Sequence, residues 1–298
     1  MPRIIFIFLA AFFMLLAIYS GGGQWSNEIE AISCMCLIII LGIPHGAIDH
    51  ILYLSKRKKP SITFYFQYLS LIALNVLFWI WLPQLAFFSF LFVSAYHFGQ
   101  SQFNHLFEVE EISEKLLYFI WGLTLMIGLI FFNMDQILAL EGIAFLFSQN
   151  FLLSSSLFLK STLIGCFTIS IGLMLIFTLL KKIKLETFLL ESIVLILILT
   201  AFYLLPLLVG FTLYFVVLHS MKVMEEEYVY LRKKQITESV SAFIKMLLPY
   251  TLLSFVGIIL LMVGIQLEFI AIPLSYMFLI LVSSITLPHI FVMELFYK

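Results

Sequence analysis

Charged residues are scarce in this chain of 298 residues. Only 11% are Asp, Glu, Lys or Arg, where a soluble domain has about 25%, and the mean hydropathy is +1.14. Apolar runs of about 20 residues recur along the whole chain, and each is long enough to cross a bilayer. The shortage of charge therefore excludes an ordinary soluble domain and predicts a polytopic helical membrane protein. The formal net charge of −1 gives no sign of nucleic-acid binding.

Cysteine is also rare, with only Cys34, Cys36 and Cys166 in the chain. Cys34 and Cys36 stand two residues apart and point to different faces of one predicted helix. No disulfide framework and no zinc motif is visible in this spacing. We interpret all three cysteines as small apolar residues.

The apolar runs predict an all-α transmembrane bundle of about ten spans that forms one integral-membrane domain over residues 1–298. Residues 31–296 would form the main bundle, and residues 3–20 an additional N-terminal anchor. Arg3, the apolar run after it and the glycines at 21–23 also resemble a signal peptide, which is the alternative for this segment. Residues 134–154 are apolar but interrupted, which is typical of a short interfacial or re-entrant helix. The expected spans are 3–20, 31–54, 62–82, 85–106, 115–132, 155–180, 186–205, 207–231, 242–264 and 268–296.

Lysine and arginine predict the orientation of these spans. All sixteen basic residues except Lys160 and Lys222 fall on one side of the expected topology. Basic residues concentrate on the cytosolic side of membrane proteins. We therefore expect both termini in the cytosol.

Four of the six histidines lie deep inside predicted spans: His45, His97, His219 and His289. At about 1.5 Å per helical residue, each lies roughly 12–18 Å from the cytosolic boundary. In a hydrocarbon core roughly 30 Å thick, this depth is close to the midplane. The four residues belong to four different spans, so their agreement in depth predicts a common layer.

An imidazole layer within a helix bundle is typical of a metal site for iron, zinc or copper. The alternative is that each histidine is a separate buried polar residue that bonds a neighbouring helix. His50 lies about one turn nearer the cytosol and roughly 140° around the helix from His45. It is therefore the weaker ligand candidate, and His105 is expected at the surface.

Polar residues and prolines lie near the predicted ligands in the sequence. Asp49 follows His45 by four residues, so on a regular helix it shares that face and can accept the other ring N–H of a ligand. Gln100 continues the face of His97, either beside the ligands or as part of a polar seam between helices. Proline directly precedes His45 and His289, and can bend each helix.

Four motifs can now be compared with known families. They are "GIPHGAIDH" (42–50), "SAYHFGQSQ" (94–102), "YFVVLHS" (214–220) and "TLPH" (286–289). In this order and spacing they resemble the Brp/Blh family of bacterial membrane carotenoid oxygenases, the β-carotene 15,15′-dioxygenases. The resemblance covers about residues 40–292.

The resemblance implies an Fe(II)-dependent enzyme that cleaves the central double bond of β-carotene with O2 and yields two molecules of retinal. It assigns His45, His97 and His219 as metal ligands, and Tyr96 and Tyr214 lie in the same motifs, where we expect them beside the ligands. The resemblance also makes residues 31–296 the catalytic bundle of a protein surrounded by lipid in the inner membrane of a bacterial cell. It implies a retinal-binding rhodopsin as acceptor of the product.

The sequence departs from the family pattern at two positions. Where the family often has a second histidine in the third motif, this chain has Val223. Where the second motif often ends in Asp, it has Gln102. The depth of His289 makes it our candidate for the fourth ligand.

Two other functions remain open from the sequence. A catalytically silent family member would bind carotenoid or retinal without cleaving it. A proton-coupled transporter would use the intramembrane His and Asp residues as a relay. Transporters often show inverted repeats and matching broken helices, and no such repeat is visible here.

Overall fold

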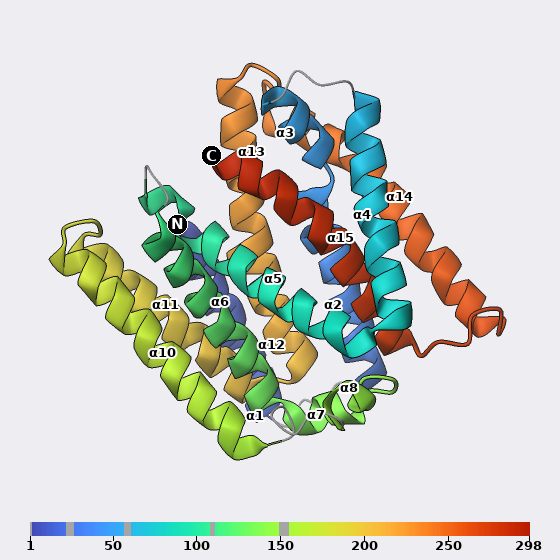
Figure 1. Cartoon of the computed structure of the whole chain (residues 1–298), viewed down its shortest axis with the longest axis horizontal. Coiled ribbons are helices and arrows are strands. Elements are labelled where there is room, and N and C mark those ends of the chain that lie inside the picture. Colours follow the sequence, from blue (N-terminus) through green and yellow to red (C-terminus); the bar gives the residue numbers. More distant parts are fainter. Residues whose placement is uncertain (1, 22–26, 57–60, 108–110, 149–154) are drawn as a thin grey trace. The chain divides into compact units, whose positions relative to one another are not determined.

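We describe the protein from a computed structural model, which covers residues 2–21, 27–56, 61–107, 111–148 and 155–298 (Figure 1). All regular secondary structure in these ranges is helical. The described ranges do not include the glycines at 22–23, which bear on the signal-peptide alternative. They also do not include the basic residues at 57–59, which bear on the orientation. The main helices are α1 (Pro2–Ser20), α2 (Asn27–Leu37), α3 (Asp49–Lys56), α4 (Ser61–Trp81), α5 (Pro83–Phe103), α6 (Ile112–Phe132), α10 (Ser156–Leu179), α11 (Leu185–Leu204), α12 (Leu207–Leu213), α13 (Met221–Lys233), α14 (Val240–Gln266) and α15 (Leu274–Tyr297).

Nine helical stretches in the described ranges are long and apolar enough to cross a membrane, which makes this a multi-pass membrane protein. They correspond to nine of the ten expected spans. The tenth, expected at 85–106, is the helix α5, but it is not among the nine. Its buried polar residues, which include His97, Gln100 and Gln102, lower its hydropathy. The interrupted segment after α6 contains the short helices α7 (Met134–Ala139) and α8 (Ala144–Ser148).

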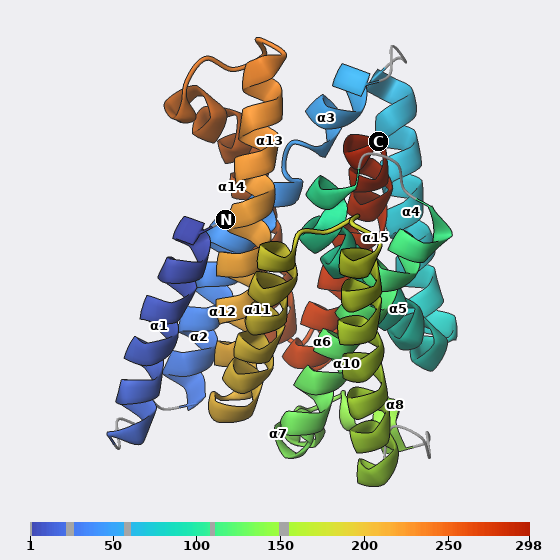
Figure 2. The same ribbon diagram turned by 90° about the vertical axis from the view of Figure 1, so that its left-hand side faces the viewer.

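The described chain divides into two compact units, residues 1–74 with 208–298, and residues 75–207. The second unit contains α5, α6, α10 and α11, and Figure 2 shows α10 running beside α6 and α11. Helices α5 and α6 approach very closely. A Cβ added at Gly99 would lie 1.8 Å from the Tyr118 carbonyl oxygen, and one added at Gly122 would lie 1.8 Å from that of Ala95. Glycine is therefore required at both positions.

The first unit contains α1 to α3, most of α4, and the chain from residue 208 onward. Helix α1 packs against the segment 214–220 and buries Phe8 and Phe12. An apolar core joins α3, α4, α13, α14 and α15. Its central buried members are Ile48, Leu52, Tyr53, Phe64, Val223, Leu231, Phe243, Leu247, Val292 and Met293.

Two spans of the first unit are not regular α-helices where they carry histidines. Residues Ile38–Gly42 form a π-helix and Ile43–Gly46 a 3-10 helix, before a turn leads into α3. Pro44 has no backbone N–H, so it cannot continue the α-helical hydrogen-bond ladder. The segment Tyr214–Ser220 is also a π-helix, a form that frequently occurs at functional sites.

Candidate functional site

Three histidines from distant parts of the chain meet inside the first unit. His45 comes from the 3-10 turn, His219 from the π-helix before α13, and His289 from α15. The ring centroids lie 4.7 Å apart for His45 and His289, and 5.2 Å apart for His45 and His219. All three side chains are buried. The predicted layer therefore brings these three imidazoles together.

Hydrogen bonds fix the orientation of two of these rings. Nδ1 of His45 faces the carbonyl oxygen of Gly42, and Nδ1 of His289 lies 2.9 Å from Oδ1 of Asp49. Both partners are acceptors, so in each neutral ring Nδ1 carries the proton and Nε2 carries the lone pair. This is the tautomer that a metal-binding histidine adopts when its other nitrogen donates to a carbonyl or a carboxylate.

Asp49 joins this cluster to α4. Its Oδ2 accepts a hydrogen bond of 3.0 Å from the hydroxyl of Tyr68, and the side chain is buried. We expected Asp49 to lie on the same helical face as His45, but it bonds His289 instead. The difference follows from the backbone, because the 3-10 turn and the following turn break the 100° spacing of a regular helix.

Glycines leave space for the side chains of this cluster. A Cβ added at Gly46 would lie 3.4 Å from Nδ1 of His289, and one added at Gly42 would lie 2.7 Å from Cε1 of Phe215. His289 and Phe215 therefore fill the space beside these two glycines.

Phe215 was not singled out from the sequence, although it lies in the third motif. Its ring stacks on that of His219 at 5.5 Å with an interplanar angle of 19°. It also meets the edge of His45 at 5.7 Å. Phe215 precedes His219 by four positions, a spacing that places two residues on one helical face. This spacing could have identified Phe215 from the sequence.

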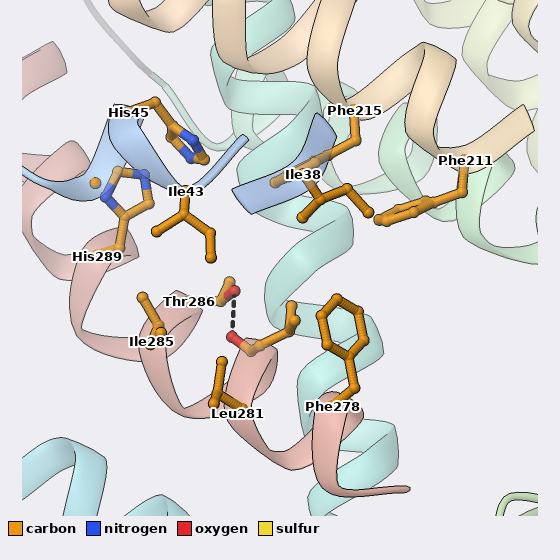
Figure 3. A pocket seen from close by; sticks show the side chains of 12 residues that line it. Ile38, Ile43, His45, Phe211, Phe215, Phe278, Leu281, Ile285, Thr286 and His289 are labelled. Carbon is orange, nitrogen blue, oxygen red and sulfur yellow. Dashed lines mark hydrogen bonds between the residues drawn. The ribbon is translucent and has the colours of Figure 1, made fainter. Parts of the chain in front are cut away.

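An apolar pocket of about 60 Å³ reaches His45 and His289 (Figure 3). Apart from Thr286 and the two histidines, its wall is hydrophobic. The Thr286 hydroxyl donates to the Val282 carbonyl oxygen at 2.8 Å, so its one proton is used within the helix. The remaining lining residues are Ile38, Ile43, Gly46, Phe211, Phe215, Phe278, Leu281, Val282 and Ile285.

A family comparison matches this chain over residues 36–297, which contain all four motifs and the histidine cluster. The matching family is described as "Beta-carotene 15,15'-dioxygenase". The chain belongs to this family. It is therefore a β-carotene 15,15′-dioxygenase-like enzyme, and its substrate class is the carotenoids. No match was found among curated proteins or among solved structures.

The two positions that depart from the dioxygenase family pattern have structural roles of their own. Val223 is fully buried in the apolar core formed with α3 and α15, one turn beyond His219. Gln102 belongs to the second unit, where its Nε2 donates to Oε2 of Glu191 at 2.5 Å.

His50 points to other helices of the first unit. Its Nε2 lies 3.2 Å from the Tyr250 hydroxyl in α14, and its ring lies beside those of Tyr65 and Tyr250. His50 therefore contacts a neighbouring helix. Tyr214, expected beside the ligands, is buried in the π-helix.

The remaining predicted site residues belong to the second unit. His97 and Gln100 are buried in α5, and Tyr96 is half-buried with its ring 6.2 Å from that of Tyr118. His105 is exposed in a 3-10 turn after α5, as expected. The assignment of His97 as a ligand rests on its motif and its predicted depth, and it stays a prediction.

Proposed function

We propose that this chain is an Fe(II)-dependent oxygenase of the bacterial inner membrane, with both termini in the cytosol. It would cleave the central double bond of β-carotene with O2 and release two molecules of retinal. In this reaction one carbon–carbon double bond breaks, and each carbon receives one of the two oxygen atoms. The observation that carries the proposal is the cluster of buried imidazoles at the end of an apolar pocket.

The donor set of this cluster suits iron. His45, His219 and His289 offer imidazole nitrogens, which suit Fe, Zn and Cu better than Mg or Ca. His97 is the further ligand that the sequence predicts. When bound, iron supplies the redox chemistry that makes O2 reactive toward a carbon–carbon double bond.

The protein's own residues hold the site and exclude water. Gly42 and Asp49 orient the rings of His45 and His289 so that Nε2 of each is the binding atom. The hydrophobic wall suits a substrate without polar atoms, and a dry pocket protects reactive intermediates from side reactions. Phe211, Phe215 and Phe278 provide flat surfaces against which a polyene can pack.

The test is coexpression with a β-carotene pathway. We expect loss of colour and the appearance of retinal in cells that make the wild-type protein. His97→Ala should abolish retinal formation. The matched control is His105→Ala, which changes an exposed histidine and should leave retinal formation nearly unchanged. Equal loss in both variants would contradict the predicted histidine layer. Carotenoid binding with bound iron but without retinal would favour the silent family member instead.

A further inference from the structure

A second cavity of about 570 Å³ lies in the first unit, on the cytosolic half of α4 and α15 as we orient the chain. This volume is within the range of roughly 300–1,000 Å³ that takes drug-sized ligands. Its wall includes Phe66 and Phe291, which are 72% and 56% exposed, so the cavity opens at the surface of the unit. We call it the α4–α15 groove, and its lining residues are Tyr53, Phe64, Phe66, Gln67, Tyr68, Ser70, Leu71, Pro288, Phe291, Val292, Glu294 and Leu295.

The groove differs from the apolar pocket in its chemistry. Five of its lining side chains, from Tyr53, Gln67, Tyr68, Ser70 and Glu294, carry a hydrogen-bonding group in addition to the hydrophobic wall. The pocket at His45 has a polar lining of only Thr286 and the two histidines. The groove therefore suits a molecule with a long apolar body and at least one polar atom.

The charges of the groove favour a neutral polar group. Among the described residues that line the groove, Glu294 alone is charged, and it pairs with Lys298 at 2.7 Å. A phosphate headgroup would meet the Glu294 carboxylate, and the described lining residues include no lysine or arginine to bind it. A neutral carbonyl or hydroxyl oxygen can instead accept a hydrogen bond from Gln67 or Ser70.

The groove is linked to the histidine cluster by adjacent residues and by hydrogen bonds. Pro288 lines the groove, and the next residue, His289, lines the pocket. Tyr68 lines the groove and donates to Asp49, which in turn accepts from His289. A ligand in the groove would therefore contact a residue that orients a predicted metal ligand.

We infer that the α4–α15 groove binds the oxygen-bearing isoprenoid product, a retinal-type molecule with a neutral oxygen at one end. This inference rests on the proposed function, because it is the cleavage that gives an apolar substrate its terminal oxygen. The pocket then faces the reacting part of the polyene at the histidine cluster, and the groove holds the product after it leaves that cluster.

The test measures binding of labelled all-trans-retinal to purified iron-free protein in nanodiscs. It does not require turnover, so it can fail or succeed independently of the proposed activity. Ser70→Trp fills the groove, and Leu69→Trp is the matched control, because Leu69 is 61% exposed on the same helix and does not line the groove. We expect Ser70→Trp to raise the Kd at least tenfold and Leu69→Trp to leave it within twofold.

A third variant separates the groove from the pocket. Ile285→Trp narrows the pocket and should weaken β-carotene binding while leaving the Kd for retinal unchanged. Retinol should compete with retinal, whereas the anionic retinoate should compete poorly beside Glu294. Equal losses of retinal binding in Ile285→Trp and Ser70→Trp would overturn the inference.

Photo-crosslinking of the wild-type protein keeps the test valid even if Ser70→Trp does not fold. A photoreactive retinoid should label peptides from residues 64–71 and 288–295, and excess retinal should suppress this labelling. Labelling confined to other segments would refute the assignment. So would a phospholipid that occupies the wild-type groove in native mass spectrometry and is not displaced by retinal.

Discussion

Removing the negative charge of Asp49 is expected to weaken metal binding without removing a ligand. In Asp49→Asn one amide oxygen replaces a carboxylate that accepts hydrogen bonds from both His289 and Tyr68. A hydrogen bond to a charged group contributes about 1.5–3 kcal/mol, and a neutral one about 0.5–1.5 kcal/mol. The loss at His289 is therefore about 1–1.5 kcal/mol, which corresponds to roughly a tenfold fall in metal affinity. This is at the lower end of the 10–100-fold range typical of partners that orient a ligand.

Two further variants set an upper and a lower limit for the fall in metal affinity expected of Asp49→Asn. His289→Ala removes an imidazole and should cost more metal affinity than Asp49→Asn. His50→Ala removes contacts with Tyr65 and Tyr250 and no contact in the histidine cluster. It should therefore leave metal affinity unchanged, and loss of the hydrogen bond should lower stability by about 0.5–1.5 kcal/mol.

The assay is anaerobic Fe(II) competition with a chelator, on variants compared at equal folded yield. The expected order of damage is His289→Ala, then Asp49→Asn, then His50→Ala. Loss of iron in His50→Ala with retention in His289→Ala would refute the reasoning. In that case His50 would supply the fourth ligand, and His289 in α15 would have only a packing role.

Three further predictions address other parts of the account. Tyr68→Phe keeps the contact between Asp49 and His289, so metal affinity should fall less than fivefold in the same chelator assay; a larger fall than in Asp49→Asn would contradict this. A reporter fused after Lys184 should read cytosolic and one near Ser148 external, and the reverse pattern would overturn the orientation. Gly99→Ala should lower the thermal midpoint of unfolding strongly, because overpacking costs about 1–3 kcal/mol or more. The control Gly165→Ala lies in open space and should be neutral or slightly stabilising. Equal midpoints in the two variants would argue against the close contact between α5 and α6.

The sequence was sufficient to predict the helical membrane class and the main members of the cluster. Span positions follow from hydrophobic length, which depends on local composition alone. The depths of His45, His219 and His289 follow from the same counting, and the structure brings these three together. Depth is insensitive to small changes in helical twist, because it depends on the rise along the axis.

Rotation about the helix axis could not be predicted in the same way. The π-helical and 3-10 segments around His45 change the angle between successive residues, so the expected pairing of His45 with Asp49 differs from the observed bond to His289. The contact also joins residues 240 positions apart in the chain. No local pattern specifies such a contact, and the same holds for the groove between α4 and α15.

The most direct test of the central claim is the product yield of purified, Fe(II)-loaded protein supplied with β-carotene and O2. The account predicts two molecules of retinal for each β-carotene consumed, no reaction without O2, and no retinal from His219→Ala prepared at equal folded yield. Retinal formation by His219→Ala at the wild-type rate would contradict it. So would an iron-loaded wild-type protein that binds β-carotene and leaves it intact.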